Sequence, residues 1–109
     1  MNANLAAAVV PRRREILRLV WDRERSAGEI AAAMSEVTFG AVSQHLRVLA
    51  REGLVSCRPD GRRRFYAADR QALAPLRKWL EQSWDGALAR LKTKAELEAS
   101  RRGPRRRTP

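Results

Sequence analysis

The most informative segment of the sequence is residues 38–55, which read Thr38-Phe39-Gly40-Ala41-Val42-Ser43-Gln44-His45-Leu46-Arg47-Val48-Leu49-Ala50-Arg51-Glu52-Gly53-Leu54-Val55. Its apolar residues recur at spacings of 3, 4, 3 and 1, which predicts one buried helical stripe formed by Phe39, Val42, Leu46, Leu49 and Ala50. Thr38 suits the N-cap, and Gly53 suits the helix stop. The segment therefore predicts a helix over residues 38–52.

A shorter helix is predicted just before this one. Ser26-Ala27-Gly28-Glu29 fits the capping box, in which the serine hydroxyl and the glutamate carboxylate each satisfy a free backbone N–H at the helix start. A short break at residues 35–37 separates the two helices. The pair predicts a helix-turn-helix, whose second helix enters the major groove of DNA.

The flanking segments complete a winged version of this motif. Residues 54–58 and 62–68 favour strands, and Pro59-Asp60-Gly61 between them is a turn signal. Helices are expected over residues 1–10 and 11–21. Asp69 is expected to cap a last long helix, with a single turn at 70–73, a restart near Pro75, and an end near residue 100.

The expected fold class is mainly α with a small β-hairpin, a winged helix-turn-helix in the order α-α-α-α-β-β-α. Residues 1–100 would form the DNA-binding domain with dimerisation helices at both ends. Residues 101–109 would form a disordered basic tail.

Composition and charge favour a nucleic-acid partner. The 109 residues suit one domain, and 23 Lys+Arg against 12 Asp+Glu give a net charge of +11. This excess costs self-repulsion and predicts a polyanionic partner, double-stranded DNA. The longest apolar run is too short to span a membrane, so we expect a cytoplasmic, nucleoid-associated protein.

The residue inventory argues against an enzyme and against a metal site. The chain has one His and one Cys, no Gly-rich phosphate loop and no metal-ligand spacing, so no cofactor and no metal are expected. The lone Cys57 is best interpreted as a small structural hydrophobe.

Two groups of residues are the candidate DNA contacts. The outward residues of the predicted recognition helix can bond base edges or allow close approach, and they are Thr38, Gly40, Ala41, Ser43, Gln44, His45 and Arg47. The alternative for His45 is a structural or water-satisfied role. The wing at residues 58–64 would lie on the minor groove or the phosphates through Arg58, Arg62, Arg63 and Arg64. The alternative for these arginines is a solvated strand.

The last helix predicts a homodimer. Its apolar stripe is larger than a small winged helix can cover alone, and the apolar segment near the N-terminus would pack beside it. The expected interface residues are Leu5, Val9, Leu76, Trp79, Leu80, Trp84, Ala87, Leu88 and Leu91.

Several of these segments resemble one family. Residues 42–55 resemble the recognition-helix signature of the ArsR/SmtB family of bacterial winged-helix repressors, residues 61–66 resemble its wing, and Trp79-Leu80-Glu81 with Trp84 resembles its C-terminal helix. The resemblance implies a homodimer that represses by occupying a promoter palindrome. Metal-sensing members carry a Cys-x-Cys pair before the turn, whereas residues 29–34 contain no Cys or His. The resemblance therefore implies the metal-independent branch, whose members often repress their own operons.

Two other functions stay open at this point. One is an architectural or RNA-binding winged helix without sequence readout, against which the polar, small-residue recognition face argues. The other is a protein-docking module, against which the net charge of +11 argues. The sequence identifies no operator, no regulated gene and no small-molecule effector.

Overall fold

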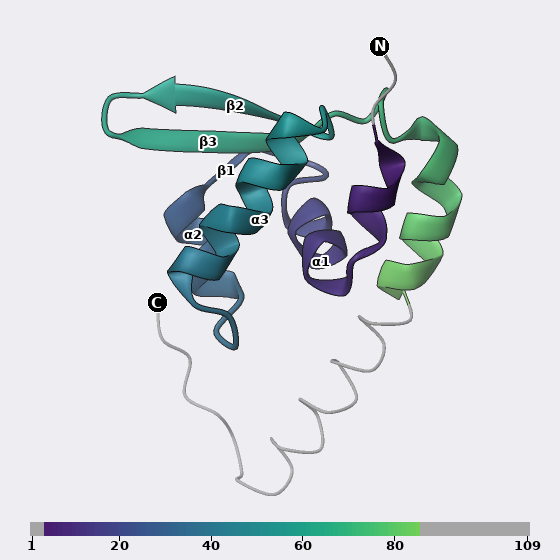
Figure 1. Ribbon diagram of the computed structural model, residues 1–109, viewed down its shortest axis with the longest axis horizontal. Helices are drawn as coiled ribbons and strands as arrows, with labels where there is room; N and C mark the ends of the chain where they lie inside the picture. The colour runs from purple at the N-terminus through teal and green to yellow at the C-terminus, as the bar shows by residue number, and fades with distance from the viewer. Residues whose placement is uncertain (1–3, 86–109) are drawn as a thin grey trace, which may run out of the picture. The chain divides into compact units, whose positions relative to one another are not determined.

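The computed structural model describes residues 4–85 and confirms the expected fold class. The elements, shown in Figure 1, are η1 (Leu5–Val9), α1 (Pro11–Leu19), β1 (Arg25–Ser26), α2 (Ala27–Ala33), α3 (Phe39–Arg51), β2 (Val55–Asp60), β3 (Arg63–Ala68) and η2 (Ala74–Leu76). Residues 77–85 are helical. Met1–Arg77 form one compact unit, and residues from Lys78 onward belong to a second. The predicted end of the long helix and the basic tail lie outside the described residues.

The helix-turn-helix is built as the sequence predicts. The Ser26 hydroxyl accepts a hydrogen bond from the Glu29 backbone N–H at 3.1 Å, and the Glu29 carboxylate accepts one from the Ser26 N–H at 2.8 Å. This completes the capping box that starts α2. The Thr38 hydroxyl accepts from the Ala41 N–H at 3.1 Å and starts α3.

The end of α3 is set by a glycine in the left-handed region. Gly53 has φ of +77°, which is costly for residues that carry a Cβ. The Gly53 N–H donates to the Ala50 carbonyl at 3.0 Å, and the Leu54 N–H donates to the Leu49 carbonyl at 2.9 Å. Leu54 is fully buried behind the turn. This closure, the Schellman motif, directs the chain into β2.

The sheet differs from the prediction in two ways. The strands β2 and β3 pair from Val55↔Ala68 to Asp60↔Arg63, so the turn lies at residues 61–62 rather than at the predicted 59–61, with Gly61 at φ of +63°. Pro59 is tolerated inside a strand because β2 lies at the edge of the order β1-β3-β2. The third strand, β1, was not predicted because a two-residue strand carries no alternation to detect.

The core lies between the helices and the base of the hairpin. Its fully buried side chains come from α1, α2, α3 and the segments that follow α3 and β3, and they include Ile16, Leu17, Ile30, Val42, Leu46, Leu49, Leu54 and Leu73. The prediction that Phe39 is buried was wrong, because its side chain is 57% exposed. Phe39 lies on the same helix face as Leu46, but it is the first residue of α3, and its side chain lines the groove between α2, α3 and the hairpin rather than the core.

The segments at the two ends of this unit also differ from the helices predicted for them. Residues 1–10 were expected to be helical, but the described part is a 3-10 helix over Leu5–Val9, and α1 stops at Leu19 rather than at residue 21. The Asp69 carboxylate accepts from the Ala72 N–H at 3.0 Å and starts a turn. Pro75 then lies in the short η2, whose first positions do not need its missing N–H.

Candidate DNA-binding surface

The outer face of α3 carries exposed polar side chains that can reach DNA bases. Gln44 and Arg47 are both exposed, and an Arg47 guanidinium N–H donates to the Gln44 Oε1 at 3.0 Å. This contact between residues three apart holds the two side chains together and leaves the Gln44 amide N–H groups as donors. Thr38 and Gly40 are exposed at the start of α3, and Ala41 and Ser43 are half-buried.

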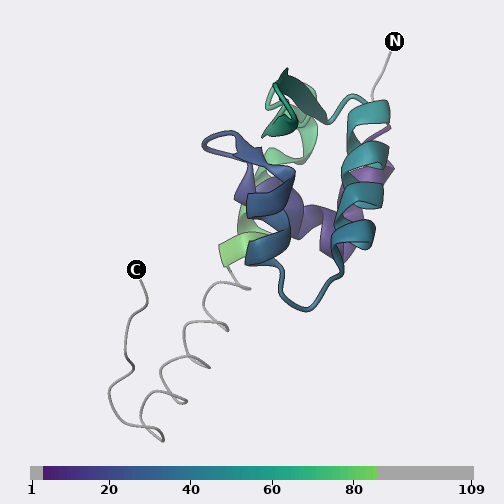
Figure 2. The ribbon, with the colours of Figure 1, turned by 90° about the vertical axis from the view of Figure 1, so that its left-hand side faces the viewer.

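A groove borders one flank of α3, between α2, α3 and the hairpin. It has a volume of about 1010 Å³, and Phe39, Ser43 and Arg47 line it at a spacing of four residues. Arginines of the hairpin tip, Arg62, Arg63 and Arg64, line the opposite wall. In Figure 2 the hairpin is viewed nearly along its strands and lies above α2, to the left of the upper end of α3. We call this feature the wing groove.

His45 lies on the other flank of α3, against α1. Its Nδ1 accepts a hydrogen bond from the Arg13 Nε at 3.2 Å, which leaves the ring proton of a neutral imidazole on Nε2. Burial lowers the pKa of His45 below its ordinary value, and the positive charges of Arg13 and then Arg12 lower it further. His45 is therefore a neutral, half-buried side chain at pH 7, held by α1.

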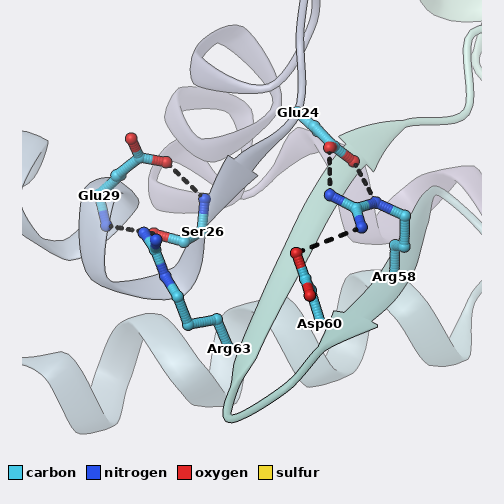
Figure 3. Close-up of polar contacts among 6 residues, drawn as sticks. All are labelled: Glu24, Ser26, Glu29, Arg58, Asp60 and Arg63. Carbon is cyan, nitrogen blue, oxygen red and sulfur yellow. Dashed lines mark hydrogen bonds and ion pairs between the residues drawn. The ribbon is translucent and has the colours of Figure 1, made fainter.

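Arg58 is bound by carboxylates of the same chain, as Figure 3 shows. Its guanidinium donates to Glu24 at 2.6 and 3.1 Å, lies 3.7 Å from Asp60, and sits 4.8 Å from the centre of the Phe65 ring. Hydrogen bonding to Arg58 lowers the pKa of the Glu24 carboxyl. Two carboxylates thus balance this cation, and the contact joins β2 to the loop before β1.

The remaining wing arginines differ in how far they are engaged. Arg63 donates to the Ser26 hydroxyl at 3.3 Å (Figure 3). Its guanidinium also lies 5.0 Å from the centre of the Phe65 ring. Arg62 and Arg64 are exposed, and no hydrogen bond or ion pair to them is found among residues 4–85. Of the predicted wing residues, these two are the cations most open to an external anion.

Sequence reasoning missed the partners of Arg58, Arg63 and His45. Glu24 is 34 residues from Arg58, and Arg13 is 32 residues from His45.

Cys57 is half-buried in the wing groove beside Tyr66. The pKa of Tyr66 is raised first by burial and then by Cys57.

The predicted interface residues are divided between the two units. Leu5 and Leu76 are half-buried, and Val9 is 44% exposed. In the second unit Trp79 is 42% exposed, whereas Leu80 and Trp84 are buried. Ala87, Leu88 and Leu91 lie outside the described residues. Within residues 4–85, no cluster of His, Cys, Asp or Glu is placed to hold a metal ion, and no helix is long and apolar enough to cross a bilayer.

The sequence of the chain is similar to those of known transcriptional regulators. Residues 10–56 match the family model described as bacterial regulatory protein, arsR family. The chain is 42% identical over 76 residues to the HTH-type transcriptional regulator Rv2034 of Mycobacterium tuberculosis, covering 70% of each chain. It is 40% identical over 73 residues to the transcriptional activator HlyU of Vibrio cholerae, covering 61% of this chain and 67% of HlyU.

The fold is also similar to solved structures, one of which is described as a transcriptional regulator. The crystal structure of a possible transcriptional regulator for arsenical resistance superposes with a TM-score of 0.62 at 40% identity, covering 83% of this chain and 93% of that one. NolR from Sinorhizobium fredii superposes with a TM-score of 0.64 at 28% identity, covering 73% of this chain and 79% of that one.

Proposed function

Because the chain belongs to the ArsR family of bacterial regulatory proteins and is a DNA-binding transcriptional regulator, we propose that it acts as a homodimeric repressor. The dimer binds a palindrome in a promoter, including the promoter of its own gene. It binds without a metal ion or cofactor and catalyses no reaction.

The exposed polar face of α3 beside the wing groove is the observation that carries this function. We assign base reading to Ser43, Gln44 and Arg47, since glutamine and arginine can each make two hydrogen bonds to a base edge. Gly40 and Ala41 add little bulk and let the helix backbone approach the bases. Thr38 supports the same face by capping α3.

The wing supplies sequence-independent affinity. Arg62 and Arg64 contact phosphates or the minor groove, because no carboxylate in the described part of the chain, residues 4–85, pairs with either charge. Arg63 joins them once its contact with the Ser26 hydroxyl is exchanged for a phosphate. Arg58 positions the wing through Glu24 and Asp60 rather than binding DNA.

A homodimer matches a palindromic site because each recognition helix reads one half-site. Val9 and Trp79 are exposed apolar side chains among the predicted interface residues, and exposure of such side chains favours a partner surface. The interface is isologous, so the same patch is used on both subunits. Sedimentation of the full chain at tens of micromolar measures this directly, and a monomer would contradict it.

In vitro transcription from the chain's own promoter tests the proposed repression. Increasing protein, with a transition-metal chelator and the Mg²⁺ that RNA polymerase needs present throughout, is expected to reduce transcript from this promoter and not from a promoter with a scrambled upstream sequence. One relative is named a transcriptional activator, so the sign of the effect is informative. An increase in transcript, or equal inhibition of both promoters, would refute sequence-specific repression.

A further inference from the structure

The first turn of α1 places cations on the flank of α3 that faces away from the wing groove. Arg13 bonds the ring of His45, and the charge of Arg12 also acts on that ring. His45 lies two residues after Ser43, which is about 200° around the axis of an α-helix. Arginines of the wing and arginines of α1 therefore lie on opposite flanks of α3.

Arg12 is placed where its charge does not stabilise the fold. Cations in the first turn of a helix oppose the helix dipole, and the first turn of α1 contains no acidic residue. The nearest carboxylate is that of Glu36, at 3.8 Å, and the two side chains are 50% and 84% exposed. Exposed pairs of this kind contribute little to stability. The fold leaves the Arg12 guanidinium half-open to solvent beside the recognition helix.

The width of the DNA major groove suggests a ligand for the Arg12 guanidinium. The major groove is about 12 Å wide, and an α-helix with its side chains is about 10–12 Å across, so a helix inserted there has a phosphate backbone on each side. If the wing arginines contact one backbone, as the proposed function has it, the other backbone would run along the flank of α3 where His45 lies.

We propose that Arg12 binds a backbone phosphate on the flank of α3 opposite the wing, and that Arg13 positions this flank by holding His45. The inference rests on the proposed function in one respect, that α3 lies in the major groove. The ligand is a phosphate diester of the DNA backbone, so the contact adds affinity without sequence preference.

Salt titration of DNA binding tests this inference. The logarithm of the association constant falls linearly with the logarithm of salt concentration, by about 0.9 for each phosphate contact. Arg12→Ala is expected to make the slope less steep by about 0.9 per protomer and to weaken binding by about eightfold per protomer at 0.1 M salt. The loss is expected on both a duplex from the chain's own promoter and a scrambled duplex of equal length.

Matched variants separate a phosphate contact from other effects. Arg12→Lys keeps the charge and is expected to keep the slope. Arg70→Ala removes one positive charge at the opposite end of α1, where Arg70 lies 5.9 Å from the Trp21 ring, and is expected to leave the slope unchanged. Glu36→Gln removes the carboxylate beside Arg12 and is expected to tighten binding. If Arg12→Ala lowers the midpoint of unfolding, Arg12→Gln replaces it and is expected to make the salt slope less steep by the same amount.

An unchanged slope for Arg12→Ala and Arg12→Gln would overturn the inference, and so would an equal loss for Arg70→Ala. The proposed function fails differently, through equal affinity of the unmodified protein for promoter and scrambled DNA. Because the slope is measured on both duplexes, that outcome leaves the effect of Arg12 readable on its own.

Discussion

At the scale of single residues, the contact between Arg13 and His45 fixes the chemistry of the only histidine in the chain. An arginine N–H can donate to the imidazole Nδ1 only while that nitrogen is unprotonated. Protonation of His45 would break this contact and place a third cation beside Arg12 and Arg13. The folded state therefore favours the neutral ring.

This gives a pH dependence of stability with a definite sign. The pKa of His45 is lower in the folded state, so its contribution is fully present above the unfolded value of about 6.5 and is lost as pH falls through the folded value. Denaturant unfolding at pH 7 and pH 5 should show this loss, and Arg13→Ala should reduce it because the nearest charge is gone. NMR titration of the His45 ring in both proteins is the check. A ring pKa that does not rise in Arg13→Ala would contradict the account.

Gln44 is the second residue whose role is tested singly, because we propose that it hydrogen-bonds to a base edge. Gln44→Ala should cost about 1–3 kcal/mol against the preferred base only, because a lost pair of hydrogen bonds to a base edge is specific to that base. Binding to operator variants and to scrambled DNA measures the difference. Equal weakening on every duplex would instead assign Gln44 to the phosphates.

Residue positions set by local chemistry could be predicted from sequence, and positions set by distant partners could not. The caps at Ser26 and Thr38 were predicted because their partners lie three residues away. The Glu24–Arg58 pair joins residues 34 apart, and no local sequence pattern indicates it. Phe39 was misplaced because the apolar spacing includes it although its side chain turns into the wing groove.

At the scale of elements, we propose that the wing combines structural arginines with arginines that face DNA. Arg62→Ala and Arg64→Ala should each make the salt slope of DNA binding less steep by about 0.9 per protomer. Arg58→Ala should leave the slope unchanged, because Glu24 and Asp60 already balance its charge. A salt titration of the three variants decides between these roles. If Arg58→Ala reduces the slope as Arg62→Ala does, Arg58 exchanges its carboxylates for phosphate on binding.

The start of α2 gives a stability prediction with an internal control. Ser26→Ala should destabilise the fold by about 1 kcal/mol, because the Glu29 N–H loses its acceptor. Ser56→Ala is the control, since its exposed hydroxyl makes only a long contact of 3.4 Å with the Ala67 carbonyl. Thermal unfolding compares the two variants. Equal losses of stability in the two variants would mean that the Ser26 N-cap contributes no more to stability than the exposed hydroxyl of Ser56.

The elements themselves were mostly predictable, and their ends were not. The apolar period of α3 is long and regular, so its type and bounds could be predicted closely. The hairpin turn was placed too early because Pro59 and Asp60 favour turns in isolation, whereas pairing with Arg64 and Arg63 extends β2 past them. Tertiary pairing decided where the strand ended.

At the scale of the whole molecule, we propose that the net charge of +11 and the two flanks of α3 together hold the recognition helix in the major groove of DNA. The sequence predicted this role through charge and motif order. The predicted interface residues extend past the described residues, so the proposed dimer rests on the palindrome and on the exposed apolar side chains of Val9 and Trp79 rather than on an observed contact. The arrangement of two recognition helices on DNA is therefore the central claim.

Footprinting of the purified full chain on the DNA upstream of its own gene tests that claim most directly. With a transition-metal chelator present, we expect protection of one palindrome, with half-sites one helical turn apart, about 10–10.5 base pairs, or a multiple of that spacing. The Gln44→Ala variant should lose this protected region at the same protein concentration. Protection spread evenly along the fragment, a single unpaired half-site, or protection that disappears with the chelator would contradict the account.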